Sequence, residues 1–339
     1  MNRFGQLIEV EKWKSKRLGA SSQPSVTNRK HSTSFFAALA DFILYMKHER
    51  QASPHTLKAY ERDLLRFGAE REALKLNLDM EGITSEEIRA HMYGLFDQKL
   101  SRATVRRDIY ALGSFFNWAV RWDVVRSNPV ARITVPRRSR TREVRALNKR
   151  ERAMLIAGAD KLAANSRRVS AKQAPLVVRL LLKTGLRRAE LLALTWNDLD
   201  VDRGELIVRH GKGDKSRRVP IEDKDLLGRL AAVRRARDID KPGNNAALVA
   251  PIFVGTLSNK LSECSFYKLF HRILKLGDLL DRGITPHTLR HTFGTMLCAA
   301  GVPVPHVKDL LGHEDIGSTM IYVHSTPREL RLAVRKLTE

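Results

Sequence analysis

The sequence predicts a mainly α-helical protein with a small β-sheet, in which an all-α helical bundle is followed by an α+β domain. Its 339 residues exceed the length of one average domain and suffice for two. Apolar residues recur every three or four positions through most of residues 34–128, which is typical of amphipathic helices. In the second half of the chain, two short alternating segments flank a glycine-rich turn, which predicts a β-hairpin.

The charge of the chain predicts a polyanionic partner. Lys and Arg number 61 against 37 Asp and Glu, which gives a formal net charge of +24. Nucleic acid is the first candidate, and a membrane surface or an acidic protein is the alternative that composition leaves open. The sequence has no apolar run of about 18 residues and no apolar stretch of signal-peptide length near its start, so we expect a cytoplasmic protein without a membrane span.

Helix-start signals define the predicted first domain. Residues 1–33 are polar and basic with little periodicity, which indicates a flexible basic arm. Four amphipathic helices then form a bundle over residues 34–130, and their starts are marked by Ser34, by Ser53-Pro54, by the capping box from Thr84 to Glu87 and by Ser101. On the fourth helix, the side chains of Arg102, Arg106 and Arg107 are candidates for phosphate contacts or, alternatively, ordinary solubilising charges.

Residues 131–147 are predicted to be a basic linker between the two domains. Arg is the commonest residue in this segment, which contains one acidic residue, Glu143, one proline and few apolar residues. If the two domains enclose a duplex, the linker passes beside phosphates. Arg137, Arg138 and Arg140 are therefore further candidates for DNA contacts.

Residues 148–339 form the predicted second domain. The apolar segment 174–183 predicts a buried helix, and Gly185 is its expected C-cap, which presents Arg187 at a helix junction beside an orienting Glu190. Residues 205–209 and 217–221 predict the hairpin, whose turn carries Lys212. The remaining expectations are a third strand at 251–254, a helix at 262–276 and a final amphipathic helix at 327–337.

A helix that starts at Thr285-Pro286 carries the first candidate site residues. His287 and Arg290 lie three positions apart and so share a face of that helix, where a guanidinium fork and free backbone amides favour an anion such as phosphate. His313 follows Leu-Leu-Gly, and Tyr322 follows nine residues later. A phenol with its ordinary pKa of about 10 becomes a useful nucleophile only where cations stabilise the phenolate.

Each of these residues also has a plainer interpretation. His287 and His291 have the spacing of a zinc pair, but the sequence lacks the Glu of HExxH and places no third ligand nearby, so we expect no metal. His313 could be a satisfied histidine at a helix end, and Tyr322 a core aromatic residue beside Ile321 and Val323. Cys264 and Cys298 lack the spacing of a disulfide framework or a zinc site and are expected to be buried thiols.

The residues in this order resemble the tyrosine recombinases, also called the phage integrase or Xer family. The resemblance matches six catalytic positions in their local contexts: Arg187 in TGLRRAEL, Lys212 in GKGDKSRRVP, His287 and Arg290 in HTLRH, His313 in LLGH, and Tyr322. In the first half of the chain, SPHTLKAYERDL resembles a stretch of the family's DNA-binding core-binding domain. The resemblance therefore implies a core-binding domain followed by a tyrosine-recombinase catalytic domain.

The family resemblance also implies a reaction. Tyr322 would attack a DNA phosphodiester to give a 3′-phosphotyrosyl link, while Arg187 and Arg290 hold the non-bridging oxygens and His313 donates a hydrogen bond. His287 would help to accept the tyrosine proton, and Lys212 would protonate the leaving 5′-oxygen. The reaction would need no cofactor, neither ATP nor a metal ion.

The resemblance further implies the partners. They are double-stranded DNA with specific recombination sites and further copies of the chain: a homo-tetramer on two DNA sites, and a monomer or weak oligomer without DNA. Accessory proteins, a location at the nucleoid and service to a mobile genetic element are further expectations. Two alternatives stay open, a type IB topoisomerase that relaxes DNA and a catalytically idle DNA-binding or regulatory protein on the same fold.

Overall fold

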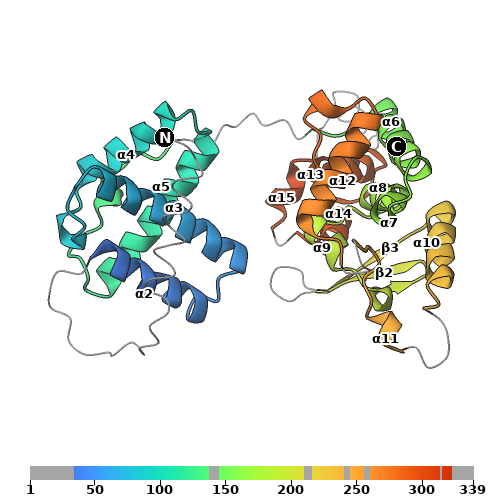
Figure 1. Cartoon of the computed structure of the whole chain (residues 1–339), viewed down its shortest axis with the longest axis horizontal. Coiled ribbons are helices and arrows are strands. Elements are labelled where there is room, and N and C mark those ends of the chain that lie inside the picture. Colours follow the sequence, from blue (N-terminus) through green and yellow to red (C-terminus); the bar gives the residue numbers. More distant parts are fainter. Residues whose placement is uncertain are drawn as a thin grey trace, which may run out of the picture. The chain divides into compact units, whose positions relative to one another are not determined.

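The computed structural model describes residues 34–136, 145–209, 216–239, 245–255, 260–313 and 315–322. The chain divides into two compact units, Met1–Thr141 and Arg142–Glu339 (Figure 1). Several predictions fall outside the described residues, namely the arm at 1–33, the side chains of Arg137, Arg138 and Arg140, the position of Lys212 and the final helix at 327–337.

The described residues of the first unit form the predicted four-helix bundle. The helices are α2 (Phe35–His48), α3 (Pro54–Ala73), α4 (Ser85–Asp97) and α5 (Arg102–Arg121), with short 3₁₀ turns η1 (Met80–Gly82) and η2 (Pro129–Arg132). Ser34, Ser53 and Ser101 cap their helices as expected, and Thr84 and Glu87 form the expected capping box. The core is aromatic, since Phe35 and Phe42 meet the ring of Phe115 with centroids 5.2 and 5.3 Å apart.

The two ends of the predicted linker pack into different cores. Ile133 is buried in the core of the bundle, and Leu147 is buried in the core of the second unit. The backbone N–H of Leu147 donates to Thr292 Oγ1 at 2.9 Å. The linker is therefore tied down at both ends of its predicted range.

The second unit is mainly helical, and its small sheet lies at one side of the helices (Figure 1). Its helices include α6 (Lys149–Ala164), α7 (Val169–Lys172), α8 (Ala174–Thr184), α9 (Arg188–Ala193), α10 (Lys224–Ala236), α11 (Asn245–Leu248), α12 (Glu263–Leu276), α13 (Pro286–Ala299), α14 (Val304–Leu311) and α15 (Gly317–Met320). Short 3₁₀ turns are η3 (Trp196–Asp198) and η5 (Leu280–Arg282). The predicted apolar helix α8 is central, because α6, α10, α12 and α13 all pack against it.

The predicted hairpin is present, and the sheet has a third strand that the sequence did not indicate. Strands β1 (Leu199–Asp200), β2 (Glu205–Val208) and β3 (Arg217–Pro220) form an antiparallel sheet in the order β1-β2-β3. The strand predicted at 251–254 is wrong, since that segment makes only isolated bridges to Thr195 and Lys260. Pro251 lacks the N–H that a strand ladder needs, which explains why pairing stops there.

The expectation of buried thiols is also wrong for one cysteine. Cys264 is exposed and Cys298 is half-buried. On α12 the buried face is set by Phe266, Leu269 and Ile273. Cys264 lies two residues before Phe266 and so points to the opposite side of the helix.

Helices α6 and α12 cross at glycine. A Cβ added at Gly158 would lie 2.5 Å from the carbonyl oxygen of Ile273 and 2.8 Å from the backbone N of Gly277. No side chain fits at this crossing, so the two backbones can approach only because residue 158 is glycine. Within the described residues, every helix is too short or too polar to cross a lipid bilayer.

Candidate active site

The C-terminal end of α14 collects three arginine side chains. A helix leaves its last carbonyl groups without partners inside the helix, and its dipole places partial negative charge there. Three consecutive carbonyl groups, which we call the carbonyl row, each accept a hydrogen bond from a different arginine. The pairs are Arg217 Nε to Leu310 O at 2.9 Å, Arg290 Nη2 to Leu311 O at 2.5 Å and Arg187 Nη2 to Gly312 O at 2.9 Å.

Gly312 makes this helix end possible. Its φ is 64°, a left-handed conformation that favours glycine, and it caps α14 as a turn at this position predicts. A Cβ at residue 312 would also lie 2.8 Å from Arg217 Nη1. Glycine therefore provides both the turn and the space in which the guanidinium of Arg217 lies.

Glu190 holds two of these arginines from the other side. Its Oε1 accepts from Arg187 Nη1 at 2.7 Å, and its two oxygens accept the fork of Arg217 at 3.0 and 2.7 Å. Burial alone would raise the pKa of Glu190, but the hydrogen bonds and charges of Arg217 and Arg187 outweigh it and hold that pKa at about 2. The carboxylate is ionised at neutral pH, and the predicted contact between Glu190 and Arg187 is confirmed.

Arg290 is 1% exposed and lies deepest in the site. Besides its bond to the carbonyl row, its Nη1 donates to Gly185 O at 2.8 Å. Gly185 has a φ of 61° and ends α8, as predicted for its C-cap. Burial, assisted by the charge of Arg187, lowers the pKa of Arg290 to about 10, so the side chain is still a cation at neutral pH.

Tyr322 is buried in a small apolar cluster apart from the main core. Its ring packs with Val307 and Leu311 of α14 and is 3% exposed. Gly294 of α13 lies under the ring, where an added Cβ would approach Tyr322 to 3.0 Å. Ile321 is 39% exposed, so Tyr322 does not belong to a continuous apolar run with its neighbour. Burial raises the pKa of the phenol, whereas the charges of Arg290 and Arg187 lower it.

Three histidines surround the phenol. His291 Nδ1 lies 2.9 Å from Tyr322 Oη, within hydrogen-bond distance. His313 stacks on the tyrosine ring with centroids 6.2 Å apart and has its Nδ1 2.9 Å from Thr319 Oγ1. His287 is exposed, and its ring lies against that of His291 with centroids 4.3 Å apart.

The histidines are neutral groups among cations. Burial, followed by the charges of Arg290 and Arg187, lowers the pKa of His313 to about 4. Burial, followed by His287 and Arg290, lowers the pKa of His291 to about 4, and burial lowers that of His287. At neutral pH the site thus combines charged guanidinium groups with uncharged imidazoles, which can each donate or accept a proton.

The structure brings five of the six predicted catalytic residues into one cluster, and the sixth, Lys212, lies outside the described residues. The five are Arg187, His287, Arg290, His313 and Tyr322. Sequence reasoning missed Arg217 and gave His291 only a rejected role in zinc binding. The signals were present, because Arg217 begins the second hairpin strand and His291 follows His287 by one helical turn. Among the described residues, no three His, Cys, Asp or Glu side chains group as metal ligands.

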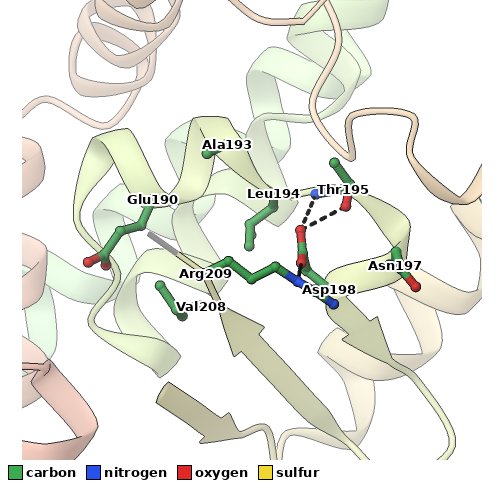
Figure 2. Close-up of a pocket in the computed structure, with 8 residues that line it drawn as sticks. All are labelled: Glu190, Ala193, Leu194, Thr195, Asn197, Asp198, Val208 and Arg209. Carbon is green, nitrogen blue, oxygen red and sulfur yellow. Dashed lines mark hydrogen bonds and ion pairs between the residues drawn. The ribbon is translucent and has the colours of Figure 1, made fainter. Parts of the chain in front are cut away.

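A small pocket of about 190 Å³ lies between Glu190, the segment 193–198 and the C-terminal end of β2 at Val208 and Arg209 (Figure 2). At its far end, Asp198 accepts hydrogen bonds from Arg209 Nε at 2.6 Å and from Thr195 N and Oγ1 at 2.9 and 2.7 Å. Arg209 and Arg217 lie on either side of residues 210–215, which include Lys212 and for which the sequence predicts a turn. Each strand of the hairpin is therefore fixed at the end nearest residues 210–215 by an arginine–carboxylate pair, Arg209 with Asp198 and Arg217 with Glu190.

The candidate DNA contacts of the first unit differ from one another. Arg102 is exposed at the start of α5. Arg106 Nη1 donates to Pro136 O at 2.9 Å. Arg107 makes a two-bond fork to the fully buried Asp63, at 2.7 and 3.0 Å, so its guanidinium is held in place rather than free. That any of the three contacts phosphate stays a prediction.

A buried histidine, His91 of α4, lies between α3 and α5, the helices that carry these arginines and their acidic partners. His91 Nδ1 lies 2.5 Å from Glu70 Oε2, and its Nε2 lies 2.9 Å from Asp108 Oδ1. Burial would lower the pKa of His91, but the hydrogen bonds and charges of Asp108 and Glu70 outweigh it and raise that pKa to about 9. Asp108 also accepts from Arg66 at 3.0 Å, so buried acids orient the basic side chains of α3 and α5.

The fold is shared with solved recombinase structures. The Tn1549 transposon integrase in complex with a circular intermediate DNA aligns with a TM-score of 0.71 at 22% identity, over 90% of this chain and all of that one. XerH site-specific recombinase bound to palindromic difH substrate aligns with a TM-score of 0.67 at 22% identity, over 89% of this chain and 85% of that one. Both units are present in these alignments, which confirms the predicted fold class.

Sequence comparison places the chain in a family. The profile of the Phage integrase family matches residues 147–329, and that of the phage integrase N-terminal SAM-like domain matches residues 39–122. Tyrosine recombinase XerD of Oceanobacillus iheyensis is 30% identical over 297 residues, 87% of this chain and 95% of that protein. Tyrosine recombinase XerC of Pelotomaculum thermopropionicum is 30% identical over 312 residues, 89% of this chain and 97% of that protein. With arginines, histidines and a buried tyrosine gathered at the end of α14, the chain belongs to the phage integrase family of tyrosine recombinases.

Proposed function

We propose that this chain cuts and rejoins double-stranded DNA at specific sites, with Tyr322 as the nucleophile. The phenol oxygen attacks a phosphodiester, a bond forms from Tyr322 Oη to phosphorus, and the bond from phosphorus to the 5′-oxygen breaks. The products are a 3′-phosphotyrosyl link and a free 5′-hydroxyl. Attack of another 5′-hydroxyl on that link rejoins the strand and releases the tyrosine. The bond energy is kept in the covalent link, so joining needs no ATP.

The observation that carries this proposal is the position of Tyr322 beside two buried or half-buried guanidinium groups. Arg187 and Arg290 lower the pKa of the phenol by their charge, against the effect of burial. The charge that develops on the non-bridging oxygens needs fixed donors in a site shielded from water. Each of these guanidinium groups uses only part of its five N–H donors on the carbonyl row, Gly185 and Glu190.

The remaining roles follow from the chemistry of the leaving group and of the phosphate. His313 is neutral and donates a hydrogen bond to a non-bridging oxygen. Lys212, from the hairpin turn between Arg209 and Arg217, protonates the leaving 5′-oxygen, because an alkoxide is a poor leaving group at neutral pH. A histidine of α13 accepts the proton of Tyr322.

We further propose that four copies of the chain act on two DNA sites and that the free protein is a monomer or weak oligomer. The charge of +24 supports DNA as the partner. Lys and Arg side chains that neutralise DNA phosphates release the counterions bound there, and this release favours binding. Similar folds have been solved on DNA: a lambda integrase dimer on a COC′ core site aligns with a TM-score of 0.64 at 20% identity, over 88% of this chain and 98% of that one. Exchange between two duplexes needs a nucleophile for each of four strands.

Replacement of the nucleophile tests the proposal. Tyr322→Phe should bind DNA as the wild type does and form no covalent adduct, because only the phenol oxygen is removed. The measurement is a denaturing gel of protein incubated, in EDTA and without nucleotide, with nicked DNA that carries the recombination site of this chain. The matched control is Tyr267→Phe, since Tyr267 is an exposed tyrosine of α12. An adduct of normal yield in Tyr322→Phe would refute the assignment of the nucleophile.

A further inference from the structure

Arg217 is the arginine of the site to which the proposed reaction assigns no task. This inference rests on the proposed function. We propose that Arg217 is a positioning residue, which acts through Glu190 and leaves the charge of Arg187 available to the phosphate. Arg217 itself does not touch the substrate. The support comes from its hydrogen bonds, its burial and the balance of charges around Glu190.

Every nitrogen of the Arg217 guanidinium donates to a protein group. Nε donates to the carbonyl oxygen of Leu310 at 2.9 Å, and Nη1 and Nη2 donate to the two oxygens of Glu190 at 3.0 and 2.7 Å. The side chain of Arg217 is 11% exposed, whereas that of Arg187 is 37% exposed. Arg217 therefore holds protein groups, and Arg187 is the arginine that a phosphate can reach from solvent.

Glu190 shares its charge between the two arginines. Its Oε1 accepts from Arg187 Nη1 at 2.7 Å and from Arg217 Nη1 at 3.0 Å. Its Oε2 accepts from the backbone N–H of Arg187 at 2.8 Å and from Arg217 Nη2 at 2.7 Å. Each carboxylate oxygen thus has one donor from each arginine. The Glu190 side chain is 6% exposed, so water screens these charges little.

Without Arg217, the charge of Glu190 would act on Arg187 alone. Burial raises the pKa of Glu190, and Arg217 is the strongest of the groups that offset this effect. Two guanidinium groups and one carboxylate keep a net positive charge, but one guanidinium paired with one carboxylate does not. Negative charge develops on the non-bridging oxygens in the transition state, so loss of the net positive charge beside them should slow the reaction.

Strand β3 directs Arg217 into the protein and its neighbour outward. Side chains alternate along a strand, so Arg217 shares a face with Val219, which is fully buried. From that face, Arg217 reaches both Glu190 of α9 and Leu310 of α14. Arg218 lies on the opposite face and is 68% exposed. The strand therefore offers a matched control, an arginine of the same charge without these contacts.

A substrate with a neutral phosphate tests whether Arg217 acts on charge. In nicked site DNA with a methylphosphonate at the scissile position, a methyl group replaces one non-bridging oxygen, so less negative charge develops there. Relative to the wild type on the same substrate, Arg217→Gln should slow adduct formation roughly 10- to 10²-fold on the phosphodiester and much less on the methylphosphonate. Arg218→Gln should match the wild type on both. Equal losses on the two substrates in Arg217→Gln, or no loss on the phosphodiester, would overturn the proposal.

A double variant tests whether Arg217 acts through Glu190. If it does, Arg217→Gln adds no further loss to Glu190→Gln, and the double variant should react at the rate of Glu190→Gln alone. Losses that multiply would contradict the proposal. This comparison also serves if Arg217→Gln fails to fold, because the double variant removes both charges of the buried pair instead of leaving one uncompensated.

A substrate with a bridging 5′-sulfur separates a second explanation. Arg217 adjoins residues 210–215, which include Lys212, the proposed acid for the leaving 5′-oxygen. A thiolate leaves without a proton, so this substrate needs no acid. Arg217→Gln should be as slow on it, relative to the wild type, as on ordinary DNA. Recovery of the wild-type rate would assign Arg217 to protonation of the leaving group and refute its action through Glu190.

DNA affinity completes the test. Arg217→Gln and Arg218→Gln each remove one positive charge, and fluorescence anisotropy with site DNA should give them the same affinity. A lower affinity for Arg217→Gln that accounts for its slower reaction would make Arg217 a DNA contact and overturn the proposal. Loss of adduct in the wild type itself would refute the proposed function rather than the role of Arg217.

Discussion

At the residue scale, one buried carboxylate sets where two guanidinium groups lie. Glu190 contacts both Arg187 and Arg217, and its pKa of about 2 shows how strongly these cations stabilise its charge. Without that charge, Arg217 and Arg187 keep their hydrogen bonds to the carbonyl row. They lose the carboxylate that accepts from their other guanidinium N–H groups. A misplacement of about 1 Å in a catalytic group can cost about 10²-fold in rate.

Glu190→Gln should therefore slow adduct formation by about tenfold or more, in the same nicked-DNA assay. The substitution should also change how the stability of the protein depends on pH. Because the pKa of Glu190 is lowered on folding, its contribution to stability is present above its ordinary pKa of 4.5 and is lost as pH falls through 4.5 towards 2. Thermal unfolding between these pH values should be less pH-dependent in the variant than in the wild type.

The control for this prediction is Glu205→Gln. Glu205 pairs with Arg218 at 3.0 Å, but the side chains of Arg218 and Glu205 are 68% and 36% exposed, and pairs at the surface contribute little to stability. This variant should match the wild type in both measurements. Equal losses in the two variants would show that removal of a negative charge, not the contacts of Glu190, causes the effect.

Residue identity was easier to predict than residue contact. Arg187, Arg290, His313 and Tyr322 are found by local motif, and the structure places them in one cluster. Arg217 and His291 contact partners that are distant in sequence, Glu190 and Tyr322 respectively. Strand alternation places Arg217 on the same face as the buried Val219 and Arg218 on the exposed face, but it does not indicate which carboxylate Arg217 contacts. Such contacts depend on how β3, α9 and α14 meet, which periodicity does not specify.

At the element scale, the helices were predicted well because their signals are local. Caps such as Ser53, Thr84 and Ser101 and the apolar spacing that follows them need only a few neighbouring residues. Strand β1 has two residues and forms only by pairing with β2, so no segment of its own sequence could indicate it. The false strand at 251–254 shows the converse, since its apolar residues are buried without a ladder.

The crossing of α6 and α12 gives a prediction at this scale. Gly158→Ala should lower the free energy of unfolding by roughly 1–3 kcal/mol, because the new Cβ would overlap backbone atoms of Ile273 and Gly277 that cannot move independently. Calorimetry of the full chain measures it as a lower Tm of the second unit. Gly228→Ala in α10 is the control, since nothing lies within 4 Å of its added Cβ, and it should be neutral or stabilising by about 0.5–1 kcal/mol. A similar Tm for both variants would contradict close packing at Gly158.

At the scale of the whole molecule, the charge of +24 predicts binding that depends strongly on salt. If six to ten phosphates are contacted, affinity should fall by roughly 10³- to 10⁵-fold between about 50 and 200 mM salt. Fluorescence anisotropy with duplex DNA of random sequence measures this slope. If Arg102 contacts the DNA backbone, Arg102→Gln should reduce the slope of log affinity against log salt concentration by about one.

The matched variant for the salt experiment is Arg126→Gln. Arg126 follows α5, is 95% exposed and is paired with Glu81, so we expect no phosphate contact from it. Its salt slope should equal that of the wild type. Identical slopes for the wild type and Arg102→Gln would remove Arg102 from the DNA-binding face.

The carbonyl row has a consequence for how this part of the sequence can vary. Arg217, Arg290 and Arg187 recognise the backbone of residues 310–312, not their side chains. Evolution can therefore exchange Leu310 without disturbing a single one of the three charges. Insertion or deletion of one residue within α14 is different, because it rotates the helix end by about 100° and carries all three carbonyl groups away from their arginines together. We therefore expect related sequences to differ in this segment by substitutions, and to have the same number of residues in it.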